Sequence, residues 1–258
     1  MRLMKRILSA AAVLALSASL LVGCSSGTAS SVPVSASSAA ESTVSSVEET
    51  ASSAVDENEA AAAPLLNDLT GSYQELWPVI LADEYKQTWL DDCTALVGED
   101  NAEAAFEKLS SMVTGDVYGE DAVKAYANGG GAYFCGFTNS LAILTFDGET
   151  STISGTDKDG NVLFSHAYHY IGMEPVRGLY EFESDDADSG EFTYFFLAPD
   201  TSAETYHIEF RYGSDAEALS QYDTGEYAYW LASGISTDCD QTMIDNCIEL
   251  FCTENLAG

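Results

Sequence analysis

Alternation of polar and apolar residues in the second half of the chain predicts a series of β-strands. Residues 205–212 alternate strictly, the preceding run 192–197 is rich in aromatic residues, and Pro199 and Asp200 separate the two. Alternation of this kind is typical of strands with one buried face. The even-numbered side chains of the second run would belong to a core. The other face, which meets solvent or a polar cavity, consists of Thr205, His207, Glu209 and Arg211.

Similar patterns predict further strands with short connections between them. Asp147-Gly148 and Asp159-Gly160 lie between consecutive strands, where such pairs favour two-residue hairpin turns. About eight strands with short connections favour an antiparallel barrel that closes its own edges. Besides the two runs above, the expected strands are a first one around residues 71–73 and others at 132–137, 141–146, 151–155, 162–170 and 178–183.

Helical periodicity on both sides of these strands makes the expected class mainly β with flanking helices. One helix is expected from Pro78, a second at 101–112, a third at 121–127 and a short one at 215–222. Thr237 and Asp240 have the spacing of a capping box for a last helix. This last helix should pack against the barrel through Met243, Ile244, Cys247, Ile248, Phe251 and Cys252.

Residues 1–24 have the pattern of an export signal, with a basic start, an apolar run and a small-residue end. They close on Leu21-Val22-Gly23-Cys24, which resembles the lipobox of bacterial lipoproteins, in which the cysteine is lipidated. Two acyl chains would give stable membrane anchoring without a spanning helix. We therefore expect an exported protein, anchored through Cys24, that faces the extracytoplasmic side of a bacterial membrane. An ordinary signal with an incidental cysteine is the alternative.

Residues 25–63 are almost wholly Ser, Ala, Val, Thr and Glu, without aromatic residues or periodicity, which is typical of a disordered tether. Residues 64–258 then form one domain of ordinary size. The formal net charge of the chain is −33, a field that repels nucleic acid and attracts cations. Nucleic acid is therefore excluded as a partner. Solubility at a cell surface explains the charge equally well.

Few motifs of known chemistry are present. The chain has none of the common nucleophile, phosphate-binding, dinucleotide-binding or zinc-protease motifs, which argues against an enzyme. The run from Asp157 to Gly160 starts like a calcium loop but lacks the later ligands, so it predicts a turn. The cysteines after Cys24 are odd in number and have no zinc-motif spacing, so at least one stays unpaired within the chain: Cys93, Cys135, Cys239, Cys247 and Cys252.

The order of several short motifs resembles the ZinT-like zinc-binding domain of periplasmic zinc-recruitment proteins and zinc-uptake lipoproteins. The resemblance implies a calycin or lipocalin-like barrel with flanking helices, zinc as the ligand, and association with a metal-uptake transporter. The motifs are Leu-x-x-x-x-Gly-x-aromatic near the start, Gly178-Leu-Tyr-Glu-Phe-Glu, Gly190-Glu-Phe-x-Tyr, Ala198-Pro199 and a later aromatic-His pair.

In that family three histidines bind zinc, one before the Ala-Pro turn and two in a His-aromatic-His pair on the next strand. Here His207 matches the last of them, Thr205 stands in place of its partner, and no histidine immediately precedes Ala198. A rebuilt site could combine His207 with His166 or His169 and a carboxylate. The candidate carboxylates nearest to His207 in the sequence are Asp200, Glu204 and Glu209.

Strand geometry limits such a rebuilt site. His166 and His169 are an odd number of residues apart, so they lie on opposite faces of a regular strand and reach one cavity only across a bulge. The alternative is that these histidines only make local hydrogen bonds. The expected function is a surface-anchored, non-enzymatic binding protein, linked by the resemblance to zinc or another divalent metal, with a divergent or lost metal site.

A second function remains open. A calycin-type barrel could instead bind an apolar small molecule or a peptide through its aromatic residues, among which Tyr227, Tyr229 and Trp230 are candidates. The same residues could equally belong to the core. A lumen filled with side chains would count against this function.

Overall fold

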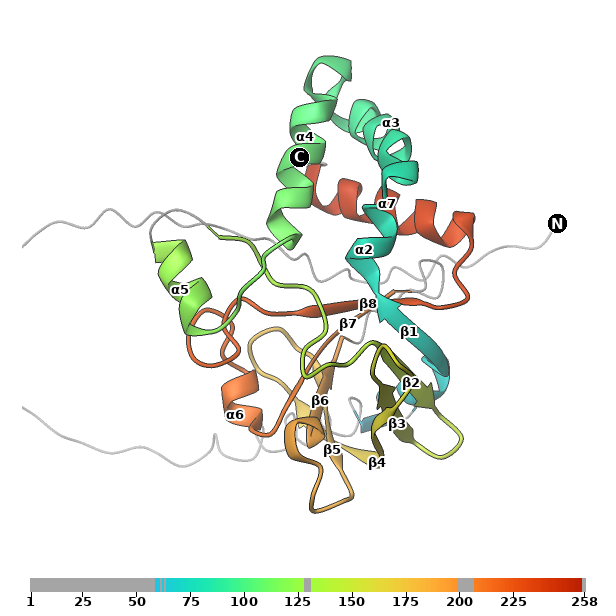
Figure 1. Ribbon diagram of the computed structural model, residues 1–258, viewed down its shortest axis with the longest axis vertical. Coiled ribbons are helices and arrows are strands. Elements are labelled where there is room, and N and C mark those ends of the chain that lie inside the picture. Colours follow the sequence, from blue (N-terminus) through green and yellow to red (C-terminus); the bar gives the residue numbers. More distant parts are fainter. Residues whose placement is uncertain (1–58, 61, 63, 128–130, 199–206, 257–258) are drawn as a thin grey trace, which may run out of the picture.

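The centre of the molecule is a closed barrel of eight antiparallel strands (Figure 1). The computed structural model describes residues 59–60, 62, 64–127, 131–198 and 207–256. Each strand pairs with its neighbour in sequence, and β1 pairs with β8 to close the barrel, which confirms the expected fold class. The strands are β1 (Gly71–Glu75), β2 (Ile143–Asp147), β3 (Thr152–Thr156), β4 (Val162–Met173), β5 (Tyr180–Ser184), β6 (Tyr194–Leu197), β7 (His207–Gly213) and β8 (Ala232–Ser236).

The barrel lumen is packed with aromatic and aliphatic side chains. On β7, Ile208, Phe210 and Tyr212 are at most 1% exposed, as their alternation predicts. Rings from neighbouring strands contact them: the centroids of Phe195 and Tyr212 lie 5.3 Å apart. Full burial of each such side chain contributes about 1.5–3 kcal/mol. Ala62 also belongs to this core, so the folded part includes a residue just before Pro64.

Most of the helices gather on one side of the barrel, beside β1 and β8 (Figure 1). A second core lies between these helices and the outer face of β8, where Ile235 packs with Trp89, Leu109 and Ile248. None of the helices in the described part of the chain is long and apolar enough to cross a membrane. The helices are α2 (Leu76–Ile80), α3 (Lys86–Val97), α4 (Glu99–Val113), α5 (Glu120–Ala127), α6 (Ala216–Leu219) and α7 (Gln241–Leu256), with short 3₁₀ turns η1 (Asp83–Tyr85) and η2 (Gly190–Phe192).

The expected strand at 132–137 is wrong, and β8 takes its place in the barrel. The segment makes only isolated bridges, from Phe134 to Thr114 and Trp230, among the described residues. The sequence of β8, Ala-Ser-Gly-Ile-Ser, does not alternate, because its lumen side and its helix side are both buried. Gly234 faces the lumen, where a Cβ atom would lie 3.1 Å from the side chain of Ile208. A strand buried on both faces gives no period-two signal.

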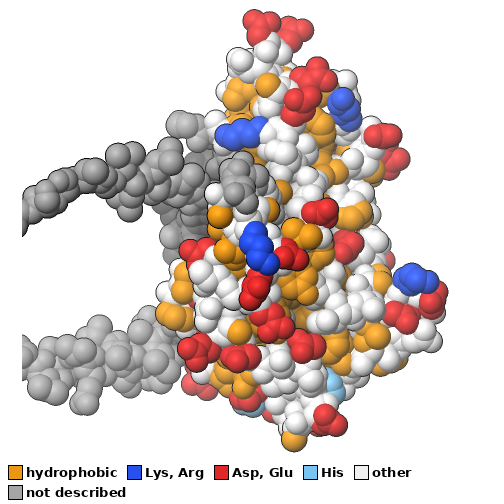
Figure 2. All heavy atoms as spheres, turned by 60° about the vertical axis from the view of Figure 1, so that its left-hand side comes forward, with side chains coloured by type: hydrophobic (Ala, Val, Ile, Leu, Met, Phe, Trp, Pro, Cys, Tyr) orange, Lys and Arg blue, Asp and Glu red, His pale blue; other side chains and the backbone are white. Residues whose placement is uncertain are grey.

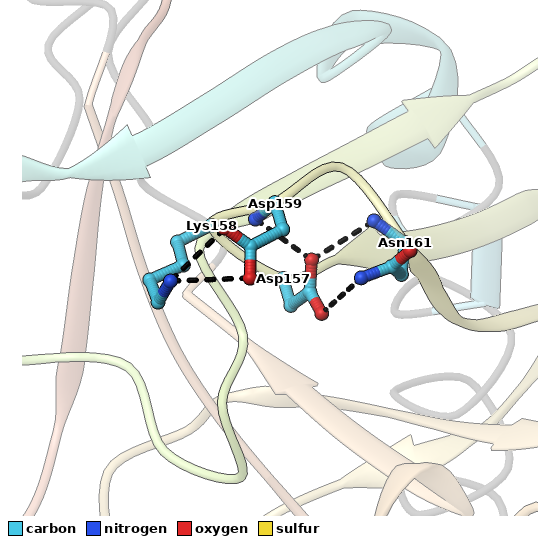
Figure 3. Close-up of polar contacts among 4 residues, drawn as sticks. All are labelled: Asp157, Lys158, Asp159 and Asn161. Atoms are coloured by element: carbon cyan, nitrogen blue, oxygen red, sulfur yellow. Dashed lines mark hydrogen bonds and ion pairs between the residues drawn. The ribbon is translucent and has the colours of Figure 1, made fainter.

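The two predicted hairpin turns are longer than expected. Asp147 pairs with Thr152 across a four-residue loop, and Thr156 pairs with Val162 across five residues, so neither is a two-residue turn. In the second loop the Asp157 carboxylate accepts hydrogen bonds from the backbone N–H groups of Asp159 and Asn161, at 2.8 and 2.9 Å (Figure 3). These bonds stabilise a wider turn. The side-chain and backbone hydrogen bonds from Asn161 lower the pKa of Asp157.

Two helix starts also differ from expectation. The helix expected from Pro78 is divided into α2 and α3, because the backbone at Ala82 is extended. Near the end of α2, the Ile80 carbonyl accepts a hydrogen bond from the Trp89 indole N–H at 2.7 Å. The last helix begins after Asp240, whose carboxylate accepts a hydrogen bond from Met243 N at 3.0 Å. Thr237 does not cap it and instead donates to the Ser72 carbonyl.

Candidate metal-binding face of strand β7

His207 and Glu209 lie side by side on the outer face of β7. Directly paired residues of an antiparallel ladder share a face. His207 pairs with Ile235, whose side chain lies in the helix-side core, and Glu209 pairs with Ser233. Both side chains are half-buried, so this face is a polar patch on the barrel wall next to the helices. The predicted division of β7 into an apolar and a polar face is confirmed, and the polar face is outside the lumen.

A pocket of about 330 Å³ lies between β1, α2, the end of α4 and residues 134–136. Cys135 lines the pocket; burial first, and then the nearby Glu209 carboxylate, raise the pKa of its thiol. The Trp77 indole N–H, also in the lining, makes no hydrogen bond of normal geometry within the described residues. No local sequence pattern predicts this pocket, because its lining comes from three separate stretches of the chain: 75–81, 113–115 and 134–136.

The structure does not bring His166 and His169 to His207. Both lie on β4, and β5 and β6 separate β4 from β7 in the barrel wall. His166 stacks on Phe164 and its Nδ1 lies 2.8 Å from an Asp186 carboxylate oxygen. The register shift in the β4–β5 pairing comes after both histidines, between residues 170 and 172. No bulge between them therefore brings them to one face.

His169 points the other way and is the more exposed of the two, with 53% of its side chain accessible against 18% for His166. Its Nδ1 lies 2.7 Å from a carboxylate oxygen of Asp185. Both histidines thus bind neighbouring aspartates of the connection that follows β5. Both histidines therefore make local hydrogen bonds, which was the alternative considered in the sequence analysis.

The remaining sequence candidates lie outside the described residues. Asp200 and Glu204 belong to the segment 199–206, and Cys24 to the first part of the chain. Within the ranges that the structure describes, no group of three or more His, Cys, Asp or Glu side chains is placed to hold a metal ion. Metal binding by His207 or Asp200 therefore stays a prediction.

The donor set on β7 suits zinc in kind. Imidazole nitrogen and carboxylate oxygen are both common zinc ligands, whereas zinc sites normally have at least three protein ligands. His207 and Glu209 supply one of each from residues two apart on one strand face. Among the described residues the fit is therefore partial.

Acidic side chains outnumber basic ones on the surface of the molecule. Acidic side chains are spread over the face drawn in Figure 2, with few lysine or arginine side chains among them. The whole chain has 42 acidic and 9 basic residues. A negative field of this kind raises the local concentration of cations near the surface. It acts on ions of equal charge alike, so selectivity among divalent cations would have to come from the ligands on β7.

Two of the three aromatic residues considered for an organic ligand, Tyr227 and Trp230, belong to the core, and Tyr229 is half-buried. Trp230 is 0% exposed and Tyr227 5%, and the Trp230 indole N–H donates to the Gly136 carbonyl at 2.9 Å. Tyr229 stacks on Tyr126, with ring centroids 3.7 Å apart. These contacts are made with neighbouring protein groups, as are those of the packed aromatic side chains in the lumen.

Comparison with known proteins gives a distant structural likeness. No protein-family model and no curated protein matches the sequence. Among solved structures, the Zn(II)-bound ZinT-like domain of Streptococcus pneumoniae AdcA has a TM-score of 0.45 and 15% identity, over 71% of this chain and 89% of that one. Zn(II)-bound AdcA from the same organism has a TM-score of 0.42 and 14% identity, over 72% of this chain and 35% of that one.

TM-scores and identities this low say nothing about a ligand or an activity of this chain. The fold is assigned from the order of its strands. The chain has the closed, eight-stranded antiparallel barrel with flanking helices that its resemblance to the ZinT-like domain implied.

Proposed function

We propose that this protein is a non-enzymatic binding protein for a divalent metal ion, zinc by resemblance, which it holds at the outer face of β7. The observation that supports the proposal is the pair His207 and Glu209, half-buried on one strand face of a strongly acidic chain. The site is a divergent one, with fewer histidines than the family pattern. The metal is cargo rather than a catalytic group.

Zinc titration of the metal-stripped chain tests the proposal. The parent for all variants carries Cys24→Ser and Cys239→Ser, which remove the thiol of the lipobox motif and the half-exposed thiol of the domain. The parent is expected to bind zinc with micromolar affinity. His207→Ala should weaken binding at least about 10-fold, because a direct ligand matters no less than the groups that hydrogen-bond a ligand, whose loss costs about 10–100-fold in metal affinity. Glu209→Gln should act in the same direction.

The matched control is His169→Ala. It removes an exposed imidazole on β4 that hydrogen-bonds to Asp185. Because β5 and β6 lie between β4 and β7, the substitution should leave the zinc affinity unchanged. Isothermal titration calorimetry with zinc in excess of a competing chelator gives the affinities. An affinity weaker than micromolar for the parent, or equal affinities for the parent and His207→Ala, would refute the proposal.

We further propose that lipid on Cys24 anchors the protein, with the barrel on the extracytoplasmic side of the membrane. The run Leu21-Val22-Gly23-Cys24 at the end of an apolar segment supports this. Cells that express the full chain should incorporate labelled fatty acid into it, and Cys24→Ser should abolish the label. Cys239→Ser, which keeps the motif, serves as the control. Label retained after Cys24→Ser would exclude this anchor.

A further inference from the structure

Two buried thiols, distant in the sequence, meet where α3 packs against α7. The Cys93 and Cys252 Sγ atoms lie 3.9 Å apart, although the residues are 159 positions apart in the sequence. Both side chains are 0% exposed. Aromatic contacts hold the two helices together near these thiols. The ring of Phe251, next to Cys252, has its centroid 6.0 Å from that of Trp89, which lies one turn before Cys93. The centroids of Phe251 and Trp77 are 4.8 Å apart.

We propose that Cys93 and Cys252 form a disulfide bond that ties α3 to α7. A disulfide has a sulfur–sulfur bond of about 2.05 Å, so the two Sγ atoms need to approach by about 1.9 Å. Rotation about the Cα–Cβ bonds moves sulfur atoms through distances of this size. The other cysteines of the domain, which take no part in this bond, are Cys135, Cys239 and Cys247.

The bond requires a two-electron oxidant. Each thiol loses one proton and one electron, a sulfur–sulfur bond forms, and a disulfide-bearing oxidant such as oxidised glutathione is reduced to two thiols. The reaction runs by thiolate attack through a mixed disulfide. Burial raises the pKa of both thiols, Cys93 and Cys252, in the folded chain. Thiolate and oxidant therefore meet while the chain is still open, and the bond closes during folding.

The structural consequence lies in the helix layer. The bond would close a long loop that contains most of the barrel, from α3 to the last helix. Long loops gain the most from a cross-link in the chain-entropy description, because the unfolded chain loses more freedom. Once formed, the bond would be shielded from reductants by the same side chains that bury the thiols, including Trp89 and Ile248.

Refolding in a redox buffer tests the proposal on the unsubstituted core. The full chain with Cys24→Ser is reduced, unfolded, and refolded with oxidised and reduced glutathione; free thiols are then alkylated under denaturing conditions and mapped by mass spectrometry. The expected result is one peptide pair joined through Cys93 and Cys252, with Cys135 alkylated. The chain refolded in reductant alone, which never forms the bond, should have a Tm on the order of 10 °C below that of the oxidised chain, given the loop length.

The contrary results are equally specific. Alkylation of both Cys93 and Cys252 after oxidative refolding, or a bond from either to another cysteine, would overturn the proposal. Cys239 is the half-exposed thiol and lies near Cys247, whose pKa is raised to about 12 by burial first and then by Cys239. Cys239→Ser is therefore the matched control and should leave the Cys93–Cys252 bond intact. The mapping does not depend on zinc binding.

Discussion

Arg211→Ala is expected to lower the free energy of unfolding by about 3–5 kcal/mol, because it removes a buried cation that holds a long loop to the barrel. The Arg211 side chain is 0% exposed, and its guanidinium donates hydrogen bonds to the backbone carbonyls of Leu219, Gln221 and Tyr227. It also lies 4.4 Å from the centre of the Tyr222 ring. Without it, three carbonyls under the loop lose their donor.

The shape of the guanidinium matters as well as its charge. Arg211→Lys keeps the charge, but its ammonium group lacks the planar fork of donors that hydrogen-bonds to the three carbonyls. We therefore expect it to recover only part of the free energy of unfolding that Arg211→Ala loses. Lys158→Ala is the control, since that side chain is 83% exposed, and it should change stability by less than about 0.5 kcal/mol. Urea unfolding followed by circular dichroism measures all three. A loss below about 1 kcal/mol for Arg211→Ala would show that the loop is held by other contacts.

Phe195→Ala is expected to lower the free energy of unfolding by about 3–5 kcal/mol, because it leaves a cavity in the packed lumen. Phe195 on β6 is 0% exposed, and its ring centroid lies 5.4 Å from that of Tyr168 and 5.3 Å from that of Tyr212. Val162→Ala, at a side chain that is 70% exposed, is the control and should be nearly neutral. Thermal unfolding gives the comparison.

The same variant tests whether the barrel binds apolar ligands. A dry cavity left by a missing ring can take up a small aromatic molecule, so benzene should raise the Tm of Phe195→Ala. The unsubstituted barrel has no such space around Phe195 and should show no shift. An equal rise in the unsubstituted protein would reveal a preformed apolar cavity and would revive an organic molecule as the ligand.

Alternation predicted those parts of the barrel that have one buried and one open face. Ile208, Phe210 and Tyr212 on β7 are the clearest case, and the odd separation of His166 and His169 correctly placed them on opposite faces. β8 was missed because both its faces are buried. Phe134 and its neighbours read as a strand because they are aromatic, yet they line a pocket and contact a loop instead.

Tertiary contacts decided the features of the site that the sequence could not show. Arg211 shares a strand face with His207 and Glu209, and alternation alone gives all three the same surroundings. The segment that follows β7 covers Arg211 and leaves the other two half-buried. The approach of Cys93 to Cys252 likewise depends on how α3 packs against α7, which no local pattern records.

A divalent metal is expected to bind through His207 on the outer face of β7. The most direct measurement is X-ray absorption at the zinc edge of the zinc-loaded chain carrying Cys24→Ser and Cys239→Ser. We expect nitrogen and oxygen neighbours at about 2.0–2.2 Å, with an imidazole contribution that is lost in His207→Ala. A shell dominated by sulfur at about 2.3 Å, or no retained zinc, would contradict the claim.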